Sequence, residues 1–149
     1  MLFGLEVNHL RVESLENPIG IEYESPRFSW WLISDETNIA QAAYQIDISA
    51  NGKTLFSSGK VSSNQNYLVQ TQFEVKPKTR YNWQVTVWNN KGKKAQSKPA
   101  YFETGLFGDW KASWISVSYN EKEKAKNPVQ QYRKEFLIKE KVKSARIYS

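Results

Sequence analysis

Side chains capable of nucleophilic or acid–base catalysis are few in this sequence. A Ser–His–Asp triad needs an imidazole as its general base, and His9 is the one histidine among the 149 residues. We interpret His9 as a surface or loop histidine, because it lies near the N-terminus beside the first expected strand. The chain contains no cysteine, which excludes a thiol nucleophile, a disulfide framework and a Cys-ligated zinc site.

Other patterns that could do chemistry are incomplete. Gly52-Lys53-Thr54 resembles the end of a phosphate-binding loop, but Asp47 stands where that loop requires a glycine. Glycoside hydrolysis needs two carboxylates that converge on one sugar, and no acidic pair has a recognisable place in a cleft. We therefore predict no catalytic residue, no metal site and no cofactor in this chain. The acidic residues considered are Glu22, Glu24, Asp35, Glu36 and Asp47.

Tryptophan is in surplus, with six residues in the chain. Exposed aromatic rings can stack on the C–H faces of sugars, and they also pack on neighbouring domains. Adjacent residues of a strand point to opposite faces, so Trp31 lies outside if Trp30 is in the core. By the same parity Trp88 lies opposite the face that carries Trp83. We interpret the exterior rings as interdomain packing surfaces, with sugar stacking as the alternative; the candidates are Trp31, Trp88, Trp110 and Trp114.

Alternation of apolar and polar residues at period two dominates residues 1–105, and no long stretch holds the 3.6-residue period of a helix. Asn51-Gly52 is a strong signal for a two-residue hairpin turn. Seven short strands separated by turn signals are typical of an all-β, immunoglobulin-like or fibronectin type III-like β-sandwich. In that topology Trp31 and Trp88 lie on opposite exteriors. The expected strands are one around Leu10, Val12 and Leu15, and then 27–33, 42–49, 54–56, 67–69, 80–88 and 100–104.

The sequence changes character after residue 105. Residues 1–105 carry 11 basic and 10 acidic side chains, whereas 106–149 carry 10 and 5. The charges of the tail come in mixed runs that are typical of a solvated loop, so we do not expect nucleic-acid binding. We expect a loop over 118–128 and strands over 131–138 and 144–148. Because two strands cannot enclose a core, we interpret 106–149 as a linker and the truncated start of a second β-sandwich domain, after a sandwich over 1–105.

The tail and the N-terminus allow three further expectations. Two strands without partners leave open edges, so we expect a homodimer through the tail, strand exchange, or docking of the tail on the sandwich. No apolar stretch approaches the roughly 20 residues that cross a bilayer, which argues against a membrane partner. Residues 1–6 lack the basic start and apolar run of a signal peptide, and a periplasmic or a cytoplasmic location is left open.

Several short motifs follow one another in a fixed order along the chain. They are Asn17-Pro18-Ile19-Gly20-Ile21, Ser25-Pro26-Arg27-Phe28-Ser29-Trp30, Gln41-Ala42-Ala43-Tyr44-Gln45-Ile46, Ser58-Gly59-Lys60-Val61, Thr79-Arg80-Tyr81-Asn82-Trp83, Phe102-Glu103-Thr104-Gly105, Asp109-Trp110-Lys111-Ala112-Ser113-Trp114 and Tyr132-Arg133-Lys134-Glu135-Phe136. This ordered set resembles the N-terminal region of bacterial α-L-rhamnosidases, which are glycoside hydrolases. The chain departs from the family pattern at Ser58, where Asp is usual, and at Asn38, where Gly is expected.

The resemblance implies that the chain is a non-catalytic N-terminal accessory module, which packs against neighbouring domains of an inverting α-L-rhamnosidase. Such an enzyme hydrolyses terminal rhamnose from glycans or glycosides. The implied partners are a downstream β-sandwich and an (α/α)₆ barrel that holds the acidic catalytic residues, and no residue of that barrel can be identified here. Two alternatives come from other classes of protein: a carbohydrate-binding module that uses exposed Trp, and a free-standing protein-binding sandwich.

Overall fold

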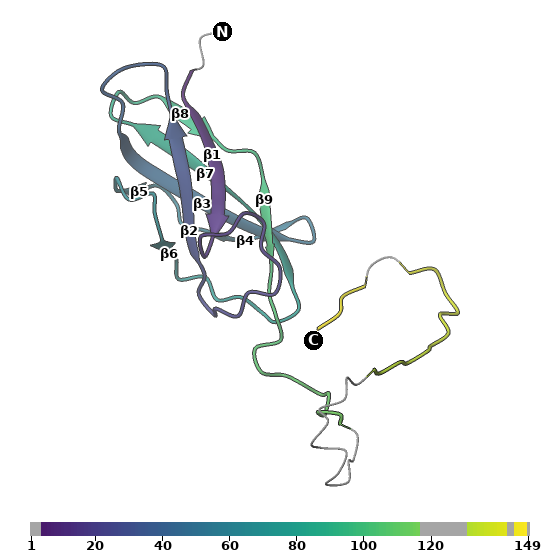
Figure 1. The fold of residues 1–149 in the computed structure, drawn as a ribbon. Coiled ribbons are helices and arrows are strands. Elements are labelled where there is room, and N and C mark those ends of the chain that lie inside the picture. Colours follow the sequence, from purple (N-terminus) through teal and green to yellow (C-terminus); the bar gives the residue numbers. More distant parts are fainter. Residues whose placement is uncertain (1–3, 117–130, 143–144, 149) are drawn as a thin grey trace. The chain divides into compact units, whose positions relative to one another are not determined.

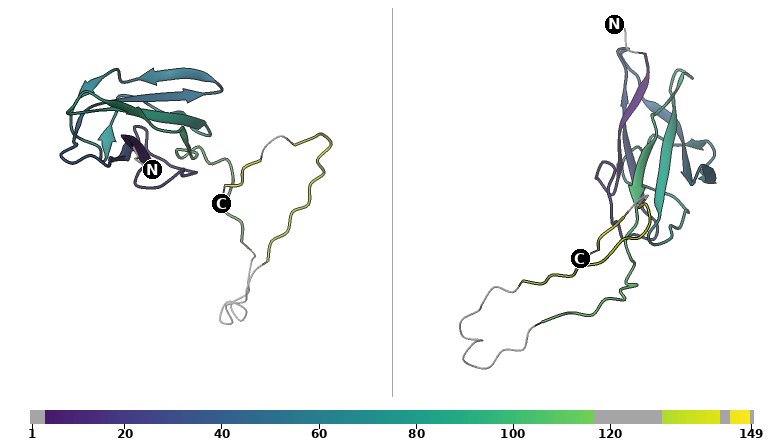
Figure 2. Two further views of the ribbon diagram at one scale, coloured as in Figure 1. Left: turned by 90° about the horizontal axis from the view of Figure 1, so that it is seen from above. Right: turned by 90° about the vertical axis from the view of Figure 1, so that its right-hand side faces the viewer.

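Two antiparallel sheets pack face to face in the first part of the chain, as the computed structural model shows (Figures 1 and 2). The structure describes residues 4–116, 131–142 and 145–148, and it divides the chain into two units, Met1–Trp110 and Lys111–Ser149. The described strands are β1 (Glu6–Val12), β2 (Arg27–Ile33), β3 (Gln41–Ala50), β4 (Lys53–Ser57), β5 (Val61–Ser62), β6 (Val69–Gln70), β7 (Arg80–Asn89), β8 (Lys94–Gln96) and β9 (Ala100–Glu103).

The smaller sheet has three strands in the order β1-β2-β6. The larger sheet has the order β4-β3-β7-β8, with β5 paired to β3 and β9 paired to β7. Its centre is the long antiparallel pair of β3 and β7, in which Ile46 faces Val85. Asn51 and Gly52 both adopt positive φ between β3 and β4, as the predicted two-residue hairpin turn requires. The predicted all-β, immunoglobulin-like sandwich is therefore confirmed.

The expected strands differ from the observed ones at the first strand and around residue 67. The first strand begins at Glu6 and ends at Val12, so Leu15 lies outside it. The strand expected over 67–69 is reduced to Val69–Gln70, because Leu68 has a φ of 48° and interrupts the extended backbone. The backbone amide of Leu68 donates to Ser29 Oγ at 2.9 Å instead of forming a ladder bond. The short strands β5 and β8 were not expected, because two or three residues carry too little alternation to be recognised.

The core is built from aromatic and β-branched side chains that both sheets direct inward. Phe28 of the smaller sheet meets Trp83 of the larger sheet edge-to-face, with ring centroids 4.7 Å apart. Trp30 meets Tyr44 in the same way at 5.3 Å. Trp30 is thus in the core, as the expected exterior position of Trp31 requires. The largest fully buried side chains are Trp30, Trp83, Tyr81, Phe28, Phe102, Ile46 and Ile48.

One buried amide joins the two sheets and a loop. Trp30 of β2 donates its indole N–H to Gln41 Oε1 of β3 at 2.8 Å. The Gln41 amide nitrogen in turn donates to the carbonyl oxygens of Ser63 and Gln65, at 3.1 and 2.7 Å. Gln41 therefore satisfies the one polar atom of the buried indole and holds the 63–65 loop in place.

The second unit contains neither strand nor helix in 111–116, 131–142 and 145–148. The strand expected over 131–138 is therefore not formed, and the described part of 144–148 is not one either. A strand needs a neighbour to receive its backbone hydrogen bonds, and these residues pair with none of the described strands. The loop expected over 118–128 lies outside the described residues, as does Ser144.

Replacing Gln41 tests how much this amide stabilises the fold. Gln41→Met keeps the side-chain length but leaves the Trp30 indole N–H and two carbonyl oxygens unpaired. We expect the free energy of unfolding, measured by urea denaturation, to fall by about 2–4 kcal/mol. Gln72→Met, at an exposed position, is the matched control, with an expected change within about 0.5 kcal/mol. Equal stabilities of the two variants would contradict the role of Gln41.

Candidate functional site

A bulge in β1 shapes the surface around Trp31. Asn8 is the partner of Trp31 in the β1–β2 ladder, and the register shifts between Asn8 and Arg11. His9 lies inside this shift with a φ of 49°, which is rare for a residue with a side chain. Such a bulge re-aims side chains relative to the regular ladder. Here it brings the His9 ring to 4.3 Å from the Trp31 ring, centroid to centroid.

Ionic groups complete the surroundings of the Trp31 ring. The Arg11 guanidinium carbon lies 5.9 Å from the centroid of the ring, within reach of a cation–π interaction. Glu16 Oε1 lies 3.4 Å from His9 Nδ1 and 3.5 Å from Arg11 Nη2. Trp31 is nevertheless 52% exposed, so part of the ring remains open to solvent. We call Trp31, His9, Arg11 and Glu16 the Trp31 cluster.

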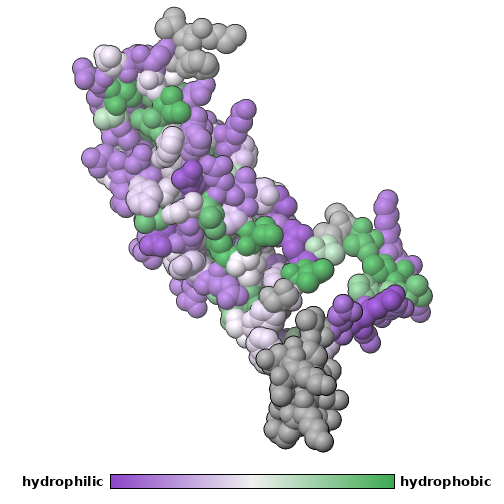
Figure 3. Space-filling model, in the orientation of Figure 1, coloured by the Kyte–Doolittle hydropathy of each residue, from purple (hydrophilic) through white to green (hydrophobic). Residues whose placement is uncertain are grey.

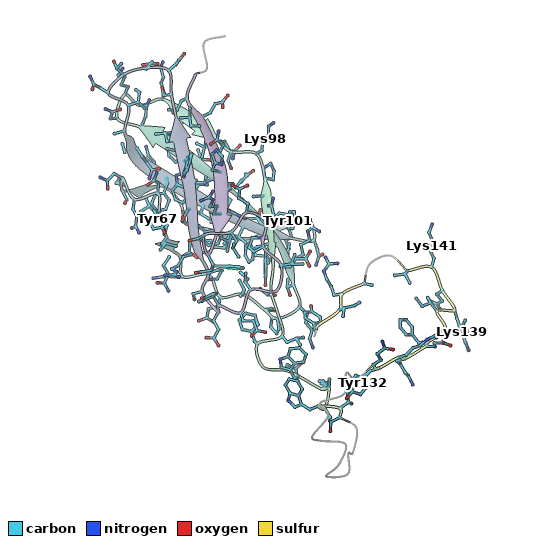
Figure 4. The ribbon with its side chains drawn as sticks, viewed as in Figure 1. Tyr67, Lys98, Tyr101, Tyr132, Lys139 and Lys141 are labelled. Atoms are coloured by element: carbon cyan, nitrogen blue, oxygen red, sulfur yellow. The ribbon has the colours of Figure 1, made fainter. Side chains whose placement is uncertain are left out.

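A groove of about 590 Å³ begins beside this cluster, with His9 and Glu16 belonging to both. Residues 5–10, from β1 and the position before it, form one wall together with Glu16 and Asn17, and residues 95, 96 and 98–100 form the other. Figure 4 shows Lys98 just before β9, Tyr101 within β9, and Tyr67 toward the opposite edge of the sandwich. The polar lining side chains include Glu6, Asn8, His9, Glu16, Gln96 and Lys98.

A buried side-chain acceptor lies beside the groove. Asn8 Oδ1 is buried and accepts no hydrogen bond from any described residue. Leaving a buried carbonyl oxygen unpaired costs about 1–3 kcal/mol. Such atoms are uncommon in folded proteins, so this one marks the wall of the groove as polar and incompletely satisfied.

The structure does not bring the four candidate tryptophans together. Trp31 belongs to the smaller sheet and Trp88 to the larger one, as the immunoglobulin-like topology predicts. Trp88 is half-buried, with Lys60 Nζ 4.8 Å from its ring centroid. Trp110 is about half exposed at the end of the first unit, and Trp114 is fully exposed within the second. Only Trp31 therefore combines an open ring with several polar groups around it.

Three of the carboxylates weighed as catalytic candidates, Glu22, Glu36 and Asp47, have structural partners. Glu36 pairs with Lys91 and Lys93, which lower its pKa. Asp47 accepts hydrogen bonds from the side-chain amide of Gln45 at 3.0 and 3.1 Å. In the part of the chain that the structure describes, no three acidic or histidine side chains are grouped to hold a metal ion. That same part contains no helix that could cross a membrane.

The motif around Asn17-Pro18-Ile19-Gly20 closes the open edge of β9. Asn17 Oδ1 accepts from the Tyr101 amide at 2.9 Å, and Pro18 O accepts from the Glu103 amide at 2.9 Å. Ile21 then forms a parallel bridge with Thr104. The motif thus lays the N-terminal segment against the larger sheet, after β1 has paired in the smaller one.

Glu22 continues this closure at the end of the sandwich. Its Oε1 accepts from the backbone amides of Leu106 and Phe107, at 3.0 and 3.2 Å. A Cβ on Gly105 would lie 2.7 Å from that oxygen and 2.8 Å from Glu22 Cγ. The absence of a side chain at residue 105 therefore allows the carboxylate to bind the departing chain.

Ser58 and Asn38, the two positions that depart from the family pattern, each fit the local backbone. Ser58 Oγ accepts from the Ile46 amide at 2.9 Å and donates to the Gly59 carbonyl at 2.8 Å, so its hydroxyl binds the backbone of the neighbouring strand. Asn38 has a φ of 59°, a conformation that glycine adopts freely and that asparagine tolerates better than most residues.

The first turn after β1 is held by a partly buried ion pair. Glu13, whose side chain is 7% exposed, accepts from the Arg27 guanidinium at 2.6 Å and from the Arg27 backbone amide at 2.7 Å. Burial of the carboxylate raises its pKa, but these hydrogen bonds and the positive charge of Arg27 outweigh it. The pKa of Glu13 is therefore below its usual value.

The Trp31 cluster could not be predicted from the sequence as a unit. The outward Trp31 and the surface position of His9 were expected, but the contact between them depends on the β1–β2 register and on the bulge. The signal in the sequence is a break in the alternation between Asn8 and Arg11, which is too short to distinguish a bulge from the end of a strand.

A family model and individual relatives both link this chain to the N-terminal region of α-L-rhamnosidases. Residues 7–108 match the family model described as the Rha78A-like, N-terminal immunoglobulin domain. An α-L-rhamnosidase of Formosa agariphila is 35% identical over a region that covers 96% of this chain and 17% of that protein. One of Streptomyces avermitilis is 37% identical over 76% of this chain and 12% of that protein.

Solved structures of α-L-rhamnosidases contain a domain that superimposes on this chain. The α-L-rhamnosidase of Streptomyces avermitilis, crystallised with L-rhamnose, superimposes with a TM-score of 0.73 over 77% of this chain and 12% of its own. The α-L-rhamnosidase of Dictyoglumus thermophilum superimposes with a TM-score of 0.70, 32% identity, and coverage of 75% and 14%. The chain thus spans less than a fifth of the length of each of these relatives.

The ion pair of Glu13 predicts a pH-dependent contribution to stability. Because its folded pKa is lowered, the contribution is present above the unfolded pKa of about 4.3 and is lost as the pH falls through the folded value. We expect the difference in unfolding free energy between wild type and Glu13→Gln to be largest near about pH 6 and to shrink below about pH 4. Urea titrations at several pH values measure it, with exposed Glu24→Gln as control. A difference that does not vary with pH would refute the interpretation.

Proposed function

The chain belongs to the family of Rha78A-like N-terminal immunoglobulin domains, and we propose that it serves as the non-catalytic accessory domain of an α-L-rhamnosidase. The match of residues 7–108 to the family model carries the proposal. The relatives are α-L-rhamnosidases of which the chain spans 12–17%. The whole enzyme would hydrolyse terminal rhamnose from glycans or glycosides.

The contacts made where the chain leaves the sandwich, at residues 105–109, support a role in interdomain packing. Glu22 binds the backbone of Leu106 and Phe107, and Lys78 Nζ lies 3.0 Å from Asp109 Oδ2. These contacts fix the position and direction in which the chain leaves the sandwich. A domain that follows would then be attached through a short, held segment, with the half-exposed Trp110 beside it.

We assign residues 1–105 to the immunoglobulin-like sandwich and 106–149 to a linker and the start of the next β-sandwich. The described tail residues are rich in exposed apolar side chains, such as Phe136, Leu137 and Ile147, which are 79%, 82% and 93% exposed. Side chains of this kind form a core once further strands cover them. The downstream β-sandwich and a helical barrel are the proposed partners.

An activity assay tests the accessory role. Against a chromogenic aryl α-L-rhamnoside, we expect no turnover from the purified 149-residue chain above the level of a mock purification. We expect turnover from the polypeptide that the same gene encodes when it extends beyond Ser149. Rhamnoside hydrolysis by the 149-residue chain alone would contradict the proposal, and so would an extended polypeptide without it.

The exposed tail predicts association through residues 111–149. Light scattering coupled to size exclusion should show concentration-dependent dimers for the full chain and a monomer for residues 1–110, because only the full chain carries the uncovered apolar side chains. A double variant, Phe136→Asp with Leu137→Asp, should shift the full chain toward monomer. Dimers of residues 1–110 would place the association on the sandwich instead and refute the tail as its cause.

A further inference from the structure

We propose that the Trp31 cluster and the groove beside it form a binding site for a neutral saccharide. The Trp31 ring is the stacking platform, and the groove between β1 and residues 95–100 supplies the polar contacts. This inference does not rest on the accessory role: it stands on side chains of the first unit alone.

The platform is held in place before any ligand arrives. His9 contacts the Trp31 ring at 4.3 Å between centroids, and Arg11 lies 5.9 Å from it. Glu16 binds both of these neighbours. The indole therefore loses little freedom when a ligand covers it, which reduces the entropic cost of binding. Its 52% exposure leaves ring surface for the C–H face of a sugar.

The groove has the size and the chemistry for a short saccharide. Its volume of about 590 Å³ lies within the usual range for small-molecule sites. A sugar hydroxyl both donates and accepts hydrogen bonds, and it needs both kinds of partner. Lys98 and Gln96 carry N–H donors, while the carboxylates of Glu6 and Glu16 are acceptors.

The charges around the groove favour a neutral ligand. Arg11 and Lys98 contribute two positive charges, and Glu6 and Glu16 contribute two negative ones. Balanced charge gives no net attraction to a polyanion, such as a polyuronate or a nucleic acid. Lys98 forms no hydrogen bond or ion pair with the other described residues, so its ammonium is available to a hydroxyl.

The unpaired oxygen of Asn8 points to a missing hydrogen-bond donor. Asn8 lines the groove, and its Oδ1 is buried without a partner among the described residues. A small rotation of the amide toward the groove would let this oxygen accept from a sugar hydroxyl. Binding would then relieve a cost that the unliganded protein carries.

On the sandwich face that Figure 3 shows, hydrophobic side chains form separate groups among hydrophilic ones. A large interface needs a more continuous apolar centre. A lone open ring next to a polar groove matches the pattern of sites in which a few polar groups fix the orientation of a ligand.

Chemical-shift mapping by NMR on the 149-residue chain tests the proposal. The probes are L-rhamnose, a neutral rhamnose-containing disaccharide and trigalacturonate. We expect one of the neutral saccharides to shift the backbone amides of Asn8, His9, Gln96 and Lys98, with a dissociation constant of about 0.1–10 mM. Trigalacturonate should shift them less at equal concentration.

Matched variants separate the site from general effects. Trp31→Ala should weaken binding at least about tenfold, the loss of about 1.4 kcal/mol, whereas Trp88→Ala on the other sheet should leave it unchanged. If Trp31→Ala unfolds the chain, Lys98→Ala at the exposed rim still tests the groove, with an expected loss of about threefold. No shift at saturating neutral saccharide would overturn the proposal. Equal losses of affinity in the Trp31→Ala and Trp88→Ala variants would also overturn it. Binding of trigalacturonate but of neither neutral saccharide would overturn it as well.

Discussion

The hydrogen bond from the buried Trp30 indole to Gln41 is the contact on which the arrangement of the sandwich depends. A large aromatic side chain fills the space between the sheets, but its N–H must find an acceptor in the dry core. Gln41 provides that acceptor from the opposite sheet and uses its own amide to bind the 63–65 loop. One polar network therefore fixes the distance between the layers and the course of a crossover loop.

The N-terminal segment that covers the edge of β9 also sets the position of the groove. The segment from Asn17 to Glu22 covers the edge of β9 from Tyr101 onward and binds the departing chain at Leu106. Among the described residues, the backbone hydrogen bonds of this segment to β9 begin at Tyr101, and β1 faces residues 95–100 across the groove. This N-terminal segment thus binds the chain where it leaves the sandwich at Leu106, and it leaves the polar groove beside residues 5–10 open.

The two proposed roles use different parts of this one domain. The held exit at residues 105–109 suits attachment to a larger enzyme, in agreement with the small share of the relatives that the chain spans. The Trp31 cluster lies on the smaller sheet, where the bulge in β1 places an imidazole and a guanidinium around an indole. A bulge costs ladder hydrogen bonds, and here it arranges side chains that a regular strand would separate.

Several features could be predicted from the sequence alone: the all-β class, the long central strands, the inward Trp30 and Trp83 and the outward Trp31. Each of these follows from local alternation and turn chemistry, which neighbouring residues encode. Its ordered motifs also indicated the family. The folded structure was needed to find the bulge at His9, the pairing of Asn17 to Ile21 with β9, and the irregular backbone of the described tail. These features depend on which distant segments pair and in what register, and pairing energy between distant segments leaves no periodic trace in either one.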